Sequence, residues 1–235
     1  MNEKQRWGIV VMFAIAMAWV ESAVVVYLRT LIDRIEPYQQ NPLPMFGGLG
    51  NIELGREIAT MVMLLTVGAL AGKNYRHRIA YALIAFGVWD ILYYIFLAPM
   101  SGWPRSIFDW DILFLLPVPW WGPVIAPASI AGLMIAGGTL VTQFDAIARR
   151  ATWFASCAGA LIALGAFMRD AILASHAGEI AIRNILPTQF EWVWFALGFA
   201  LMSAPVVEMV WQMCAGFNSF ARGARPARQV RRENV

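Results

Sequence analysis

The chain has 235 residues, of which 60% are hydrophobic and 14% are charged, and its mean hydropathy is +0.59. This is too little polar surface to cover a water-soluble globule of that length, so we expect lipid to be its solvent. The net charge of +3 does not indicate a nucleic-acid partner, because the basic residues gather at particular points along the chain. Composition therefore predicts an integral membrane protein whose first partner is the lipid bilayer.

Six apolar stretches approach or exceed the roughly 20 residues that a helix needs to cross hydrocarbon. A further apolar run, Ile112–Leu116, is followed by Pro117-Val118-Pro119 and is too short for a full span. The sequence thus predicts an all-α, polytopic membrane helical bundle of about six transmembrane helices, with a re-entrant or interfacial segment between helices three and four. We expect residues 1–217 to form this domain and residues 218–235 to form a basic cytoplasmic tail. The six stretches are 7–32, 57–72, 79–98, 123–142, 152–175 and 192–217.

Lysine and arginine predict the orientation, because the cytoplasmic loops of membrane proteins carry an excess of both. Here they occupy alternate connections, which an even number of spans places on one side. We therefore expect both termini to be cytoplasmic, in a bacterial cytoplasmic membrane. The residues concerned are Lys4, Arg6, Lys73, Arg76, Arg78, Arg149 and Arg150, together with Arg222, Arg225, Arg228, Arg231 and Arg232 in the tail.

Ionisable residues at membrane depth are rare. Each one suggests a functional site and needs a partner group. In hydrocarbon each one must be paired, protonated or hydrated, and pairs such as Glu21 with Arg169 or Asp90 with Arg29 are physically reasonable. Two interpretations stay open: the charges only fix helix register, or they line an outward-facing polar cavity for a substrate or an ion. The residues within or at the ends of the predicted helices are Glu21, Arg29, Glu57, Asp90, Arg169 and Asp170.

Two local patterns add candidate site residues on the predicted outer side. Tyr93 and Tyr94 follow Asp90 by three and four residues, so one helix face carries a carboxylate and two phenols. In the loop that follows, the carboxylates of Asp109 and Asp111 can point the same way from an extended or turn backbone, as a cation or a polyol would need. A solvated loop is the alternative for this second pair.

The chain lacks the usual motifs of hydrolytic and redox enzymes. It has no Walker loop, HExxH, CxxC or GxSxG sequence. Cys157 and Cys214 are too few and too far apart for a metal knuckle, and His77 and His176 fall on opposite sides of the predicted membrane. We therefore expect neither haem nor zinc, and no cofactor is indicated.

One part of the chain is similar to known sequences. The stretch Phe86–Asp90, together with Gly102-Trp103-Pro104, Trp110-Asp111 and Pro117–Pro123, resembles a group of bacterial multi-spanning membrane proteins. The resemblance implies no substrate and no catalytic residue.

Three functions are compatible with these features. The first is a small transporter or binding protein with an outward-facing acidic and aromatic cavity. Carboxylates without histidine or thiolate favour protons or hard ions such as Mg²⁺ and Ca²⁺, while nearby aromatic rings also suit an organic ammonium ion. The second is a non-catalytic subunit that binds other membrane proteins. The third is an enzyme acting on a lipid-linked substrate at the outer leaflet, with Asp90, Asp109 or Asp111 as acid, base or metal ligand.

Overall fold

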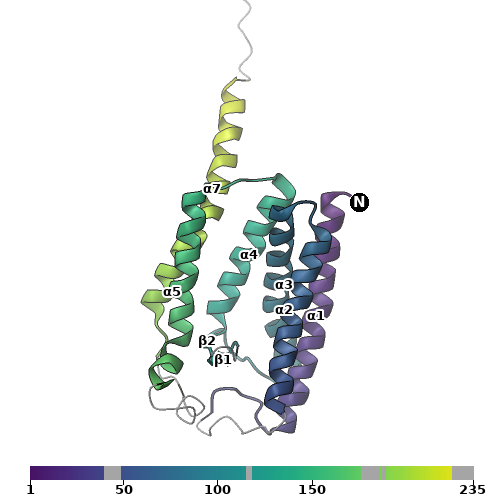
Figure 1. Ribbon diagram of the computed structural model, residues 1–235, viewed down its shortest axis with the longest axis vertical. Coiled ribbons are helices and arrows are strands. Elements are labelled where there is room, and N and C mark those ends of the chain that lie inside the picture. Colours follow the sequence, from purple (N-terminus) through teal and green to yellow (C-terminus); the bar gives the residue numbers. More distant parts are fainter. Residues whose placement is uncertain (40–48, 115–117, 176–185, 187–188, 224–235) are drawn as a thin grey trace, which may run out of the picture.

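The computed structural model describes residues 1–39, 49–114, 118–175, 186 and 189–223. Within this part of the chain, six helices are long and apolar enough to cross a membrane, which confirms the predicted number (Figure 1). The second helix begins earlier than predicted, because the ionisable residues at its start are taken into the helix. The six are α1 (Glu3–Leu31), α2 (Leu49–Ala71), α3 (Tyr75–Ser101), α4 (Ile125–Phe144), α5 (Arg150–Ser175) and α7 (Trp192–Gly223).

Short polar side chains begin two of these helices. The Asn2 side chain accepts a hydrogen bond from the Gln5 backbone N–H at 2.8 Å, and the Gln5 side chain accepts one from the Asn2 N–H at 3.0 Å. Asn74 likewise accepts from the His77 N–H at 2.9 Å at the start of α3. These caps satisfy donors that the first helical turn leaves free. At its other end α3 stops at Gly102, whose φ of 73° is a left-handed conformation that glycine adopts without strain.

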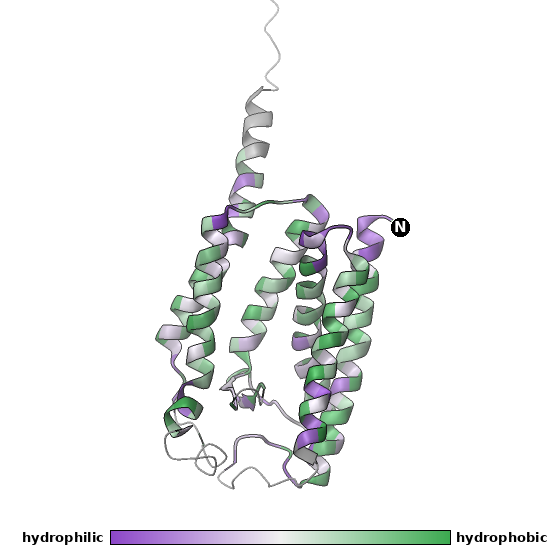
Figure 2. Ribbon diagram, in the orientation of Figure 1, coloured by the Kyte–Doolittle hydropathy of each residue, from purple (hydrophilic) through white to green (hydrophobic). Residues whose placement is uncertain are grey.

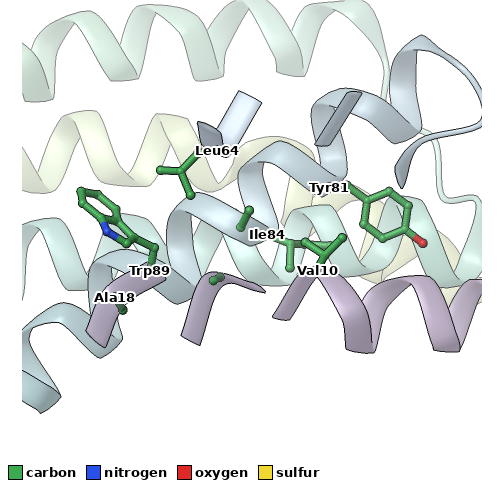
Figure 3. Packing of buried hydrophobic residues seen from close by; sticks show 8 residues of the cluster. Val10, Ala18, Leu64, Tyr81, Ile84 and Trp89 are labelled. Carbon is green, nitrogen blue, oxygen red and sulfur yellow. The ribbon is translucent and has the colours of Figure 1, made fainter. Parts of the chain in front are cut away.

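Helix α3 is the centre of the larger helix group and packs against α1, α2 and α4 (Figure 1). Its Tyr81 and Ile84 are fully buried beside Val10 of α1 and Leu64 of α2 (Figure 3). Toward α4, a Cβ atom at Gly87 would lie 2.5 Å from the Ala131 carbonyl oxygen, so α3 and α4 are in backbone contact there. Close approach through small residues is the usual way in which helices pack in lipid.

Helices α5 and α7 form a second unit, in which they pack chiefly on each other (Figure 1). A Cβ at Gly159 would lie 2.4 Å from the Gly198 carbonyl oxygen, so the two backbones touch. It is α7 and not α5 that packs along α4, where Met209 and Val141 share a buried cluster. Helix α5 is therefore separated from α1, α2 and α3.

A small sheet precedes α4 at the end of the bundle away from the N-terminus (Figure 1). Strand β1 (Trp110–Ile112) pairs antiparallel with β2 (Trp121–Pro123), with Asp111 opposite Gly122. This is the segment predicted to be re-entrant or interfacial. Its described residues form the hairpin, residues 115–117 lie outside the described ones, and a re-entrant course stays a prediction.

The loops with basic residues meet at the other end of the molecule. The N-terminus, the α2–α3 turn and the α4–α5 connection lie together there, and Figure 2 shows hydrophilic residues at this end and apolar ones along the helices. The Arg6 guanidinium donates to the Ala71 carbonyl at 2.7 Å, and that of Arg76 donates to the Ala146 carbonyl at 2.8 Å. We call this the basic end. Helix α7 continues past it into the first residues of the predicted tail, and residues 224–235 lie outside the described ones.

Candidate functional site

Ionisable and phenolic side chains from three helices and a strand gather in the half of the bundle opposite the basic end. They come from the second half of α1, the start of α2, the second half of α3, and β1. We call this set the charged cluster; its members are Glu21, Arg29, Glu53, Arg56, Asp90, Tyr93, Tyr94 and Asp111.

A buried ion pair connects the hairpin to α1. The Arg29 Nη2 atom lies 3.0 Å from Asp111 Oδ1, and the two side chains are 11% and 2% exposed. Arg29 also donates to the Ile35 carbonyl at 3.2 Å, and its guanidinium lies 4.3 Å from the centre of the Trp103 ring. These contacts give the arginine an anion, a carbonyl and a π face in place of water.

Asp111 has further partners. Its Oδ1 accepts the Ile112 backbone N–H at 2.9 Å, and the Tyr94 hydroxyl lies beside the carboxylate. Burial raises the pKa of Asp111 above its ordinary value, while Arg29, the Ile112 N–H and Tyr94 act in the opposite direction. These three donors therefore stabilise the ionised form of the carboxylate against burial.

A second group of charges lies between α1 and α2. Glu21 forms an ion pair with Arg56, and its Oε2 accepts a hydrogen bond from the Thr60 hydroxyl at 3.2 Å. Arg56 also binds Glu53, with Nε donating to Oε2 at 2.9 Å, and Glu57 adds a negative charge beside them. One arginine thus neutralises acids from two helices.

The two ion pairs suggested from the sequence are wrong. Glu21 pairs with Arg56 instead of Arg169, because α2 is next to α1 whereas α5 is separated from it by the rest of the larger group. Arg29 pairs with Asp111 instead of Asp90, because the hairpin places Asp111 at the end of α1.

Asp90 differs from the other acids of the cluster. It is 9% exposed, and its Oδ2 has no hydrogen-bond partner among the described residues. Gly87, one turn earlier on α3, touches the α4 backbone, so this face of α3 is covered by a helix that has no charged residue between Ile125 and Phe144. A buried acceptor without a partner is costly and calls for a bound proton or cation.

Tyr94 connects α3 to the hairpin. Its hydroxyl hydrogen-bonds the Asp111 carboxylate, and Tyr94 follows Asp90 by four residues, on the same face of α3. Its ring meets those of Tyr93 and Trp103 edge to face, with centroids 4.9 and 6.3 Å apart. Packing of this kind restricts the orientation of the Tyr94 ring.

Asp109 does not join Asp111. Its Oδ2 accepts the backbone N–H groups of Arg105 at 2.7 Å and Ser106 at 3.2 Å, so it caps its own turn. The two carboxylates therefore do not point the same way: Asp109 lies in a turn before β1 begins, and short acidic side chains in turns bind nearby backbone.

Arg169 and Asp170 lie outside the charged cluster. At the end of α5 the Arg169 Nη1 atom is 3.1 Å from Asp170 Oδ1, and its Nε is 3.0 Å from Glu191 Oε1. The Arg169 side chain is 49% exposed, as expected for a surface ion pair. Of the predicted site residues, the structure thus brings Glu21, Arg29, Asp90, Tyr94 and Asp111 together, with Glu57 beside Arg56.

Sequence reasoning missed two members of the cluster, Glu53 and Arg56, of which Arg56 links two helices. The sequence places it next to Glu53 and Glu57, which suggests a solvated helix start. In the structure it lies inside α2, one turn before Thr60, and faces α1. The available signal was the turn-by-turn spacing of Glu53, Arg56 and Thr60, which puts one polar stripe on an otherwise apolar helix.

A pocket of about 420 Å³ lies between the hairpin and the start of α7. Neighbouring residues of a strand point to opposite faces, so Trp110 faces this pocket while Asp111 faces the charged cluster. The pocket is therefore distinct from the cluster, and no charged residue lines it. Its lining residues are Phe108, Trp110, Pro123, Gln189, Phe190 and Trp192.

The described residues include no group of three or more His, Cys, Asp or Glu side chains arranged to hold a metal ion. His77 lies at the basic end, between Glu3 and Asp145, and His176 lies outside the described residues. No family model matches the chain, and neither does any curated protein or solved structure.

Proposed function

We propose that the chain is a small transporter or binding protein, and that its charged cluster receives a cation or a polar small molecule. The observation that carries this proposal is Asp90, a buried carboxyl group with an acceptor oxygen that no described residue satisfies. Burial of such a group costs on the order of 2–7 kcal/mol unless something compensates for it. Arg29 and Arg56 are engaged by Asp111, Glu21 and Glu53, so neither is free to compensate Asp90. We assign that role to a ligand.

The two ends of the molecule support the predicted orientation. The basic end carries the alternate Lys- and Arg-rich connections, which favours a cytoplasmic location in a bacterial cytoplasmic membrane. Both termini are then cytoplasmic, and the charged cluster lies toward the outer side. The hairpin and its tryptophans, on this model, form an interfacial or re-entrant segment that covers the cluster.

Cysteine labelling in intact cells tests this orientation. In a Cys157→Ser/Cys214→Ser background, we expect Phe108→Cys near the hairpin to react with a membrane-impermeant maleimide. Asn74→Cys in the α2–α3 turn should react only after the membrane is permeabilised. Reversed accessibility would refute the orientation.

Uptake by proteoliposomes tests the function. The full chain is assayed with protons, Na⁺, K⁺, Mg²⁺, a tetraalkylammonium ion and a polyol. We expect flux or binding of at least one of these, and we expect Asp90→Asn to abolish it because the amide is neutral. Glu36→Gln is the matched control, since Glu36 is a half-exposed outer carboxylate paired with Arg105. Equal activity in the two variants would contradict the proposal. Co-purification of partner proteins without flux would instead favour a subunit of a larger complex.

A further inference from the structure

The surroundings of Asp90 restrict which cation the site can hold. Helix α1 supplies Glu21 and Arg29 to the charged cluster, and Arg29 already binds Asp111. Helix α3 itself supplies Tyr93 and Tyr94, β1 supplies Asp111, and α4 supplies no charged residue. From α2, Arg56 is occupied by Glu21 and Glu53, beside Glu57. Both positive charges of the cluster are therefore already paired.

A metal ion requires more than this arrangement provides. Ca²⁺ takes six to eight oxygen ligands, whereas the described residues contain no group of three candidate ligands. Mg²⁺ binds through one or two carboxylates but keeps several waters, whereas Asp90 is only 9% exposed. Space is also short, because a single Cβ added at Gly87, one turn from Asp90, would lie 2.5 Å from the Ala131 carbonyl oxygen. A proton needs only one carboxyl oxygen and no additional volume.

We infer that the cation at this site is a proton, that Asp90 holds it as a neutral carboxylic acid, and that Tyr94 and Asp111 connect Asp90 to the outer side. This inference rests on the proposed function and names its ligand. The Tyr94 hydroxyl can donate one hydrogen bond and accept another. It hydrogen-bonds Asp111, and Tyr94 lies one helical turn after Asp90 on the same face of α3, where both side chains are buried.

The transfer between the two carboxyl groups is balanced. When Asp90 releases its proton to the Tyr94 oxygen, the hydroxyl proton of Tyr94 passes to the Asp111 carboxylate. One O–H bond forms for each one that breaks, so the tyrosine is unchanged. The negative charge moves from Asp111 to Asp90, and Asp111 then gives the proton to water at the hairpin.

Dicyclohexylcarbodiimide provides the test, because it modifies carboxyl groups that are protonated in apolar surroundings. The purified full chain is treated and digested, and the adduct is located by mass spectrometry. We expect an adduct on Asp90 that is absent in Asp90→Asn, that forms more slowly as the pH rises, and that Na⁺, Mg²⁺, Ca²⁺ or tetramethylammonium does not suppress. Glu36, which is half-exposed, is the unmodified internal control.

The possible outcomes are distinct. Suppression of the adduct by one of these ions at constant pH would overturn the inference of a proton while leaving the proposed cation site intact. An Asp90 adduct with no proton flux in proteoliposomes would retain the proton and refute transport. If no adduct forms, infrared difference spectra of the chain against Asp90→Asn decide: loss of a carboxylic acid C=O band supports the inference, and its absence overturns it.

The connecting role of Tyr94 has its own measurement. Tyr94→Phe keeps the ring and removes the hydroxyl, so we expect the Asp90 adduct to persist while proton flux falls on the order of 100-fold. Tyr27→Phe is the matched control, since it removes the hydroxyl of a tyrosine that is 67% exposed and lies outside the charged cluster. Equal flux in the two variants would refute the path.

Discussion

Replacing Arg29 with methionine tests how the hairpin is held over the charged cluster. The substitution keeps most of the side-chain volume and removes the charge that faces Asp111 at 3.0 Å. Asp111 is 2% exposed, so its carboxylate would remain buried without a cation. Breaking a buried ion pair from one side costs about 3–5 kcal/mol of unfolding free energy. We expect Arg29→Met to lower the unfolding free energy by an amount in this range at neutral pH.

The size of the loss should depend on pH. Burial raises the pKa of Asp111, and removing Arg29 takes away one of the effects that lower it. A carboxyl group whose pKa is raised in the folded state binds more protons folded than unfolded, so stability falls as the pH rises. The loss in Arg29→Met should therefore be smallest below about pH 4, near the pKa of an unfolded aspartate, and should grow as the pH rises through the folded pKa of Asp111.

A double-mutant comparison isolates the pair. Arg29→Met/Asp111→Asn removes both charges, so we expect it to be more stable than Arg29→Met by about 2 kcal/mol or more. Asp111→Asn alone should cost less than Arg29→Met, because Arg29 keeps the Ile35 carbonyl and the Trp103 ring. Asp109→Asn is the control, since an amide oxygen can still accept from Arg105 and Ser106.

Unfolding by dodecyl sulfate in mixed micelles, followed by tryptophan fluorescence at several pH values, measures these differences. A larger loss of unfolding free energy in Asp111→Asn than in Arg29→Met would refute the idea that the unpaired carboxylate causes the loss. A loss in the double variant equal to the sum of the two single losses would show that Arg29 and Asp111 do not interact, since the effects of independent sites add.

Two further predictions concern the α5–α7 unit. Gly159→Leu should lower the free energy of unfolding by about 1–3 kcal/mol, because a Cβ there would lie 2.4 Å from the Gly198 carbonyl oxygen. Gly165→Leu is the control and should leave that free energy unchanged, because nothing lies within 4 Å of a Cβ at Gly165. Equal losses in the two variants would contradict the backbone contact. Glu208 accepts hydrogen bonds from the Arg149 N–H at 3.1 Å and the Thr152 hydroxyl at 2.7 Å. Glu208→Ala should therefore speed hydrogen exchange at the start of α5 more than Gln212→Ala does, and similar rates in both would argue against this cap.

The charged cluster shows where sequence reasoning stops. The sequence indicates that Glu21, Arg29, Asp90 and Asp111 are unusual, because a charge inside or beside an apolar span is visible residue by residue. Their partners depend on which helices are neighbours. Glu21 meets Arg56 because α2 packs beside α1, and Arg29 meets Asp111 because the hairpin folds over the end of α1.

The sequence by itself determined the six apolar helices and the gathering of basic residues in alternate connections. Both are properties of consecutive residues: the length of an apolar run and the sign of the charges that follow it. Only the tertiary structure decided that Asp109 caps a turn while Asp111 enters the cluster, and that Arg169 stays outside it with Glu191. It also showed that Asp90 keeps an oxygen without a partner. The physical reason is that a buried charge is compensated by whatever packing brings within a few ångströms, and that distance is not encoded in local sequence.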